Sequence, residues 1–137
     1  RGFGPARGMK WGRVSSEDYF REINDTVVLL ALVEDIEGVE QIEEIAASGL
    51  LDVLWVGTGD LAMAYGHPGD RDHADVQAAA ERILAACLEH GVAAGYPARS
   101  PEEAQWAAEQ GYRAIGYAGA EAYVMKQSRA FLDAVGR

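Results

Sequence analysis

The sequence predicts an α/β fold built from parallel β/α units, and two features support this. First, four short apolar segments are each followed by a helical pattern. Strands that alternate with helices in this way form β-α-β units, whose strands lie parallel in one sheet. Second, the units recur about every 30 residues, the spacing of an eight-stranded β/α barrel. Four units would make half of such a barrel.

The individual elements follow from local signals. A Ser-Ser-Glu-Asp cluster at 15–18 is typical of a helix start, because a serine cap and first-turn acids complement the helix dipole. The uninterrupted apolar run 27–33 is typical of a strand buried on both faces. Ser100 followed by Pro101 predicts another helix start, and Gly111 predicts its end. In chain order we predict a helix over 17–23, a strand over 27–33, a helix over 38–47, a strand over 53–56, a short helix over 60–65, a helix over 74–90, a strand over 92–96, a helix over 101–110, a strand over 114–117 and a helix over 121–135.

An open flavodoxin-like sheet is the alternative architecture. Such a sheet usually has five strands and a phosphate-binding loop after the first. Here the first strand is followed directly by Glu34-Asp35, without a glycine-rich loop. The half-barrel is therefore the favoured prediction.

A basic, glycine-rich segment, residues 1–16, precedes the repeating units. Its first 13 residues carry four basic side chains and no acid. Two interpretations stay open: a disordered arm, or a long loop that brings positive charge to an anionic substrate. We expect residues 17–137 to hold the four units, within one partial-barrel domain over 1–137. Because the chain begins with Arg1 rather than Met, we expect a fragment or a processed product.

Composition and charge argue against several classes of function. Hydrophobic residues make up 49% of the chain and charged residues 25%, as in ordinary globular domains. The net charge of −10 argues against general nucleic-acid binding, which depends on Lys and Arg. No apolar run approaches the ~18 residues of a membrane helix, so we expect no membrane partner. Cys87 is the only cysteine, which excludes an internal disulfide and makes the cytoplasm the expected location.

Two carboxylates follow neighbouring predicted strands. Glu34 ends the first strand, and Asp60 follows the second through a Gly-Thr-Gly turn. In parallel α/β folds the working residues lie at this carboxyl edge of the sheet. Two converging acids repel unless a cation joins them or one is protonated, and hard oxygen ligands suit Mg²⁺ or Mn²⁺. The alternative is two solvated loop acids in a chain with 22 acids.

The turn itself also has a possible role in binding. Gly57 and Gly59 let backbone N–H groups come close to an anion where the turn becomes a helix. That arrangement would suit a substrate carboxylate. A glycine pair at a strand end is by itself a weak signal, because such pairs are common in turns.

Together these residues match a known pattern. The matching residues are, in order, Tyr19, Asn24, Val33-Glu34, Gly57-Thr58-Gly59-Asp60-Leu61-Ala62, the loop Tyr65-Gly66-His67-Pro68-Gly69, Asp75-Val76 and Gly95. The pattern resembles the class II pyruvate-dependent aldolases of the HpcH/HpaI family, typified by 4-hydroxy-2-oxoheptanedioate aldolase. Arg7-Gly8 resembles the Arg-Gly of the long loop after the family's fourth strand. The resemblance covers nearly the whole chain and implies the C-terminal half, strands 5–8, of a TIM-type (β/α)8 barrel.

The resemblance also implies a function. It implies a divalent-metal-dependent carbon–carbon lyase that acts on 2-oxo acids, of the pyruvate or oxaloacetate type, through a pyruvate enolate. Glu34 and Asp60 would hold Mg²⁺ or Mn²⁺, the backbone of Gly59 and Asp60 would bind the substrate carboxylate, and Pro97 would line the substrate pocket. The metal would act as a Lewis acid, so no Schiff-base lysine is required, and Lys126 is not placed like one.

The sequence also departs from the family pattern in ways that bear on substrate preference. The departures are Thr58 for the usual Pro, Ala62 for Ser, Pro97 for an aliphatic residue and Ala120 for the Asp after the final strand. The family's catalytic Arg and His–Asp pair come from the first half of the barrel, so we identify no catalytic residue in this half. We expect the full-length parent to be an enzyme and the chain alone to be inactive. The rival functions are an oxaloacetate decarboxylase, a citrate-lyase-like enzyme and a non-catalytic half-barrel that binds a metal or anion.

The remaining reactive side chains are expected to have structural roles. His67, His73 and His90 are predicted to be ordinary surface histidines, and Arg99 a solvated loop residue. Cys87 is predicted to lie in the core. Because a half-barrel has exposed sheet edges, we expect a homo-oligomer.

Overall fold

The computed structural model describes residues 7–117 and 119–136, and a parallel sheet lies at its centre. The strands follow the order β1-β2-β3-β4, and each consecutive pair is parallel. The four strands are β1 (Leu30–Val33), β2 (Val53–Val56), β3 (Ala93–Ala98) and β4 (Ala114–Tyr117). Each is joined to the next by helices, so the predicted β/α units are present. Among the described residues, no helix combines the length and the apolar character needed to cross a membrane.

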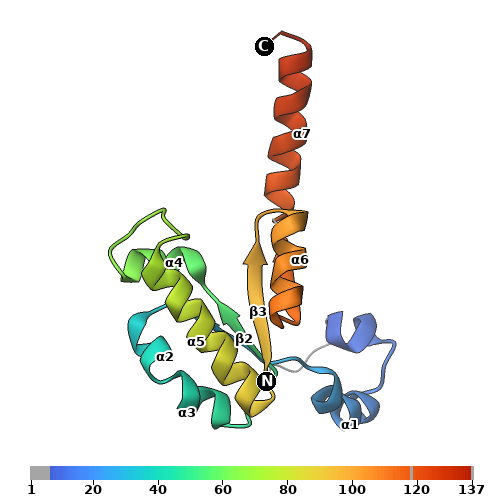
Figure 1. Ribbon diagram of the computed structural model, residues 1–137. Coiled ribbons are helices and arrows are strands. Elements are labelled where there is room, and N and C mark those ends of the chain that lie inside the picture. Colours follow the sequence, from blue (N-terminus) through green and yellow to red (C-terminus); the bar gives the residue numbers. More distant parts are fainter. Residues whose placement is uncertain (1–6, 118, 137) are drawn as a thin grey trace.

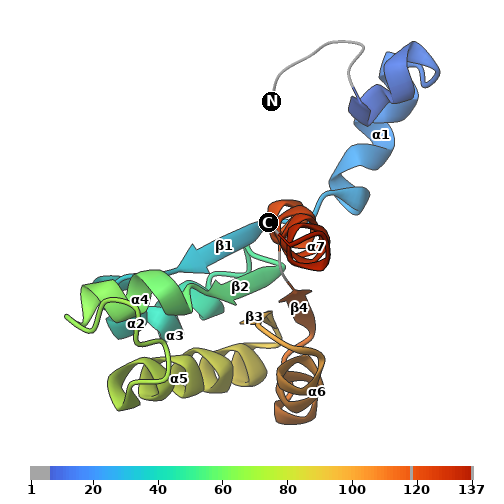
Figure 2. The ribbon, with the colours of Figure 1, turned by 90° about the horizontal axis from the view of Figure 1, so that it is seen from above.

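The helices occupy nearly the positions that the sequence predicts. They are α1 (Ser16–Thr26), α2 (Ile36–Glu40), α3 (Ile42–Ala47), α4 (Thr58–Ala64), α5 (Ala74–His90), α6 (Pro101–Gln110) and α7 (Ala120–Ala134), preceded by a short 3-10 element, η1 (Arg7–Gly12). Helices α5 and α6 lie on the same side of the strands (Figure 2). Helix α7 extends away from the sheet (Figure 1). Residues 1–6 of the basic segment lie outside the described residues.

Several helix ends are set by caps that are visible in the sequence. Ser15 accepts a hydrogen bond from the Asp18 N–H at 3.1 Å, and Ser100 accepts one from the Glu103 N–H at 3.1 Å. Gly111 ends α6 with a φ of 110°, a left-handed conformation that favours glycine. These local contacts explain why the predicted bounds of α6 agree with the structure.

Two predicted elements differ from the structure in where they begin, and one of them is also divided in two. The helix predicted over 38–47 starts at Ile36, since Asp35 accepts the Gly38 N–H at 2.7 Å, and it divides at Gln41 into α2 and α3. The strand predicted over 27–33 begins only at Leu30. Val27, the first residue of the predicted strand, instead caps the end of α1, because its N–H donates to the Ile23 carbonyl.

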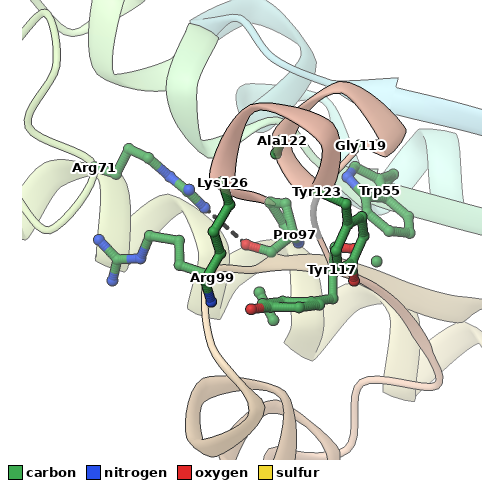
Figure 3. A pocket seen from close by; sticks show the side chains of 11 residues that line it. Trp55, Arg71, Pro97, Arg99, Tyr117, Gly119, Ala122, Tyr123 and Lys126 are labelled. Carbon is green, nitrogen blue, oxygen red and sulfur yellow. Dashed lines mark hydrogen bonds between the residues drawn. The ribbon is translucent and has the colours of Figure 1, made fainter. Parts of the chain in front are cut away.

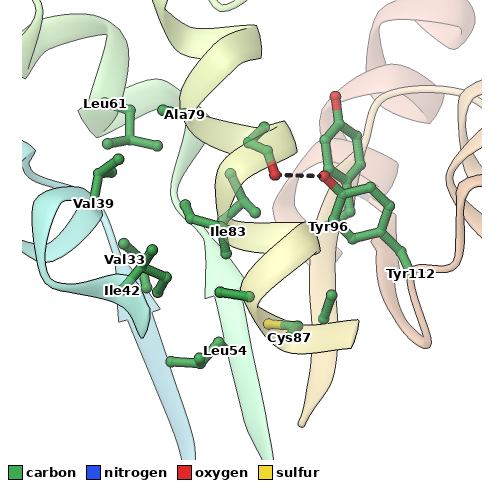
Figure 4. Close-up of a cluster of buried hydrophobic side chains, with 14 of the residues drawn as sticks. Val33, Val39, Ile42, Leu54, Leu61, Ala79, Ile83, Cys87, Tyr96 and Tyr112 are labelled. Atoms are coloured by element: carbon green, nitrogen blue, oxygen red, sulfur yellow. Dashed lines mark hydrogen bonds between the residues drawn. The ribbon is translucent and has the colours of Figure 1, made fainter. Parts of the chain in front are cut away.

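The core lies between one face of the sheet and the helices that pack on it (Figure 4). Leu54 on β2 and Ile83 on α5 are fully buried there. Cys87 is buried in the same layer, as predicted. The Tyr112 hydroxyl donates to the Ala80 carbonyl at 3.2 Å, so this buried polar group is satisfied.

The opposite face of the sheet is less covered, and here one prediction is wrong. Leu30 and Leu32 alternate with the inward-facing residues of β1, and Leu32 is 57% exposed. The first strand is therefore not buried on both faces, because side chains of a strand point alternately to its two sides and the helices cover one of them. Trp55 fills part of the open face, where it lies against Gly95 and Gly116 of the next two strands.

Candidate functional site

The carboxyl ends of β1 and β2 approach each other closely at Gly57. The Gly57 N–H donates to the Val33 carbonyl at 2.9 Å. A Cβ atom at Gly57 would lie 2.6 Å from the Cβ of Glu34, so only glycine permits this approach. The contact holds the start of the Glu34 side chain beside the turn that leads to Asp60.

Both predicted metal-binding acids are exposed. Asp60 lies in the first turn of α4, and Glu34 directly follows β1. Within residues 7–117 and 119–136, neither carboxylate takes part in a side-chain hydrogen bond or an ion pair. Two free carboxylates at neighbouring strand ends are a donor set that fits a hard cation such as Mg²⁺ or Mn²⁺.

The residues predicted to bind substrate line one shallow hollow. Gly59, Asp60 and Pro97 all contribute to this hollow, which has a volume of about 260 Å³. Trp55 and Arg71 are among its other walls. The structure therefore brings the three predicted substrate-binding residues together at the carboxyl edge of the sheet, next to the strand that ends at Glu34.

Sequence reasoning missed Arg71, which crosses this edge. Its Nε donates to the Thr58 hydroxyl at 2.6 Å, and its Nη2 donates to the Pro97 carbonyl at 2.8 Å. Gln77 holds the Arg71 carbonyl with a 2.9 Å hydrogen bond. These bonds tie the loop between α4 and α5 to the ends of β2 and β3. No periodic pattern in the sequence marks Arg71, and the only signal is a cation between two acids, Asp70 and Asp72.

A larger cavity of about 640 Å³ adjoins the hollow and shares Trp55, Arg71 and Pro97 with it. Figure 3 shows three cations, Arg71, Arg99 and Lys126, on one side of Pro97. The aromatic rings of Trp55, Tyr117 and Tyr123 lie on the other side. The cavity thus has a basic end and an aromatic end. Lys126, for which the sequence indicated no role, lies on its wall.

Arg99 lines the same cavity, but its charge is already neutralised. It forms ion pairs with Asp72 at 2.8 Å and Glu103 at 3.0 Å. The hydrogen bonds from Arg99 lower the pKa of Asp72. Burial raises the pKa of Glu103, but the hydrogen bonds and charge of Arg99 outweigh it, so this pKa is also lowered. The prediction of a solvated loop residue misses this anchoring, because Asp72 is 27 residues away in sequence.

Two of the predicted surface histidines form a cluster instead. The rings of His67 and His73 stack with centroids 3.3 Å apart. Asp75 accepts from His67 at 2.9 Å and lies 3.4 Å from His73. Two imidazoles and a carboxylate offer ligand atoms within 4.8 Å of one another. The prediction is corrected for these two residues, because the loop that contains Arg71 folds back and brings them together. His90 is exposed at the end of α5, as predicted.

Comparison with curated proteins shows relatives that are named aldolases. A hydroxypyruvate/pyruvate aldolase from Paraburkholderia phytofirmans is 36% identical over 118 residues, covering 86% of this chain and 45% of the relative. A 5-keto-4-deoxy-D-glucarate aldolase from Klebsiella pneumoniae is 39% identical over 89 residues, covering 65% of this chain and 34% of the relative. This chain therefore spans less than half the length of these curated relatives.

Solved structures show the same relation in three dimensions. An HpcH/HpaI aldolase/citrate lyase family protein from Burkholderia cenocepacia J2315 matches with a TM-score of 0.83 and 36% identity, over 100% of this chain and 53% of that one. An HpcH/HpaI aldolase from Desulfitobacterium hafniense DCB-2 matches in fold with a TM-score of 0.83 at 24% identity, over 98% of this chain and 52% of that one. The predicted fold class, half of a β/α-barrel of this type, is confirmed.

The family assignment rests on a match across most of the sequence. The model of the HpcH/HpaI aldolase/citrate lyase family matches residues 10–123, which include every residue of the hollow. This range also includes the Glu34 and Asp60 carboxylates and the Arg71 loop. The chain belongs to the HpcH/HpaI aldolase/citrate lyase family.

Proposed function

We propose that the protein containing this chain is a divalent-metal-dependent carbon–carbon lyase that acts on 2-oxo acids through a pyruvate enolate. One observation carries the proposal: two carboxylates without a side-chain partner among the described residues, Glu34 and Asp60, lie at neighbouring strand ends by a hollow that Gly59 and Pro97 line. The aldolase names of the relatives support the same class of reaction.

Each residue of the site has a separate task in this proposal. Glu34 and Asp60 hold Mg²⁺ or Mn²⁺, a cation that supplies Lewis-acid stabilisation of negative charge on the substrate oxygens. The backbone N–H groups of Gly59 and Asp60, in the first turn of α4, have no partner within the helix and bind the substrate carboxylate. Pro97 lines the substrate pocket and restricts its width.

Calorimetric titration with Mn²⁺ tests the metal site. We expect wild-type chain to bind Mn²⁺ and the Asp60→Ala variant to lose that binding. Asp70→Ala is the matched control, because Asp70 is an exposed acid in the following loop and lies outside the hollow. Equal Mn²⁺ binding by wild type and Asp60→Ala would reject the assignment.

We propose further that the chain alone does not turn over substrate. Proton transfer requires a positioned acid or base, and the loss of such a group typically costs ~10²–10⁴-fold in rate. His67 and His73 are engaged with Asp75, and His90 lies at the end of α5. Exchange of the pyruvate methyl protons in D₂O with Mn²⁺ should therefore stay at background for the chain and be rapid for the parent enzyme. Rapid exchange by the chain, abolished in Glu34→Gln, would overturn this.

Oxaloacetate decarboxylation and citrate-lyase-like cleavage are the rival reactions for the parent, and a non-catalytic half-barrel is the rival for the chain. Oxaloacetate decarboxylation and citrate-lyase-like cleavage would use the same cation and the same carboxylate-binding turn as the proposed aldolase reaction. Analysis of the products formed from each candidate substrate therefore has to separate the three reactions. A non-catalytic module would bind Mn²⁺ in the titration without methyl-proton exchange in the parent protein.

Self-association is part of the proposal. Helix α7 exposes apolar side chains, including Val124, Met125 and Phe131, and such patches are typical of interfaces. We expect a homo-oligomer by sedimentation analysis, and a monomer at all concentrations would contradict this. Cytoplasmic location stays a prediction.

A further inference from the structure

Two histidines of the loop between α4 and α5 converge on one oxygen atom. The Nε2 of His67 lies 2.9 Å from Oδ2 of Asp75, and the Nδ1 of His73 lies 3.4 Å from the same oxygen. The two rings stack with an interplanar angle of 20°, so each presents a nitrogen to the same carboxylate. In the part of the chain that the structure describes, this is the one group of three His, Cys, Asp or Glu side chains close enough to hold a metal ion together.

The separations between these atoms are close to those between the ligands of one metal ion. In a tetrahedral site with bonds of about 2.0–2.2 Å, two ligand atoms lie roughly 3.3–3.6 Å apart. The Nδ1 of His73 is already at that distance from the Asp75 oxygen. The Nε2 of His67 would have to move away by only a few tenths of an ångström. A small ion could therefore enter between the three atoms with little rearrangement.

The ring nitrogen of His73 has a lone pair that faces the carboxylate. This Nδ1 accepts the Asp75 N–H at 3.3 Å, so it carries no proton of its own. The bond is longer than the usual range of about 2.7–3.2 Å, and so it holds the lone pair weakly. An acceptor nitrogen and a carboxylate oxygen 3.4 Å apart repel each other unless a cation lies between them. This arrangement favours a bound cation over a simple ion pair.

The backbone of the loop holds the ligands in position. The His67 N–H donates to the Ala62 carbonyl at 2.7 Å, and the His67 carbonyl accepts from the Asp70 N–H at 3.0 Å. His73 is the N-cap of α5, and Asp75 lies in the first turn of that helix. His67 and Asp75 are only eight positions apart in the chain. The site is therefore built from one short segment, and its ligands need no other part of the protein.

We propose that His67, His73 and Asp75 bind Zn²⁺ at a second metal site, separate from the site proposed at the strand ends. Two imidazole nitrogens and one carboxylate suit zinc, whereas Mg²⁺ prefers oxygen ligands. The two histidines are half-buried and the aspartate is exposed, so a water molecule can fill the fourth position. Arg71 lies in the loop between the two histidines and lines the hollow. The ion would thus fix the loop that borders the hollow.

Calorimetric titration of the full-length protein with Zn²⁺ tests this site. Asp60→Ala is the background, because it removes one of the two proposed ligands at the strand ends. His67→Gln and His73→Asn each remove one imidazole and should weaken zinc binding about 100-fold or more, since even the partners of metal ligands change affinity by about 10–100-fold. Asparagine is a good N-cap, so the second variant keeps the start of α5. His90→Gln is the matched control, because His90 is exposed at the other end of α5.

Hydrogen exchange provides a readout that a purely structural role of the histidines would not change. Zinc should slow amide exchange over residues 66–77 in the Asp60→Ala background and leave it unchanged when His73→Asn is added. Millimolar Mg²⁺ should neither have this effect nor displace the zinc.

Three results would rule the zinc site out: no zinc binding in the Asp60→Ala background, equal zinc affinity in the two histidine variants and the His90→Gln control, or displacement of zinc by Mg²⁺. Each would mean that the three side chains form only a helix cap with an ion pair. The outcome is independent of the proposed lyase function. If zinc binding depends on His67 while Mn²⁺ binding does not depend on Asp60, the metal site at the strand ends is wrong and the zinc site stands.

Discussion

The two faces of the sheet have similar apolar residues but different surroundings. On one face, Leu54 of β2 is fully buried against helices. On the other, Leu32 of β1 is 57% exposed although it lies in the same sheet. The covered face packs against the helices and forms the core. The open face contributes Leu32 and Trp55 to the hollow at the carboxyl ends of the strands. The difference teaches that burial in this chain depends on which face a residue occupies, and not on its hydrophobicity.

The largest expected effect comes from truncation on the covered side. Ile83→Ala removes a fully buried side chain of α5 and should cost about 2–5 kcal/mol in the free energy of unfolding, because it leaves a cavity. Leu32→Ala, on the open face, should cost about 1 kcal/mol or less. Urea denaturation measures both. Similar losses for the two variants would contradict the comparison and would mean that the open face is covered in solution.

Cys87 reports on how well the covered layer excludes water. Burial raises the pKa of its thiol to about 11, from an ordinary value of 9.0. At pH 8 the reactive thiolate should therefore be about 100-fold scarcer than in an exposed thiol, before any steric protection. A thiol reagent should react slowly with the folded chain and rapidly in denaturant. Reaction at the rate of a free thiol without denaturant would show that the layer opens.

On the open face, the tightest packing is between Trp55 and Gly95. A Cβ at Gly95 would lie 2.5 Å from Cε3 of Trp55, so Gly95→Ala should cost about 1–3 kcal/mol. Combination with Trp55→Leu should recover much of this loss, as a double-mutant cycle would show. Gly59→Ala is the control, since no atom lies within 4 Å of a Cβ there. An additive result for the double variant would disprove the contact.

The smallest expected change in the free energy of unfolding is for Glu103, which lies in the first turn of α6 and pairs with Arg99. Its pKa is lowered in the folded chain, so the charged form stabilises the fold above the ordinary pKa of 4.5. Glu103→Gln should cost about 1 kcal/mol at pH 7, and the difference from wild type should vanish as the pH falls through the lowered pKa. Thermal unfolding between pH 3 and pH 7 measures this. A difference that does not change with pH would assign the loss to packing instead.

Local signals account for the parts of the fold that were predicted well. The bounds of β2, α5, α6 and β4 agree with the prediction, because caps such as Ser100 and Gly111 act within a few residues of the chain. The split at Gln41 and the late start of β1 were missed. No side chain caps the backbone at Gln41, so no local signal marks the split. Near the late start of β1, Asp52 accepts from the Leu29 N–H at 2.7 Å from 23 residues away.

For the candidate site, the sequence by itself determined which groups end each strand. Glu34, Gly59 and Asp60 were placed there because the order of strands and helices follows from apolar periodicity and parallel strands end at one edge. Pro97 was named only from the family resemblance. Only the tertiary structure decided what faces these groups. Arg71 and the His67–His73 pair lie in a loop without periodicity, and their contacts with Thr58, Pro97 and Asp75 exist only once that loop folds back over the strand ends.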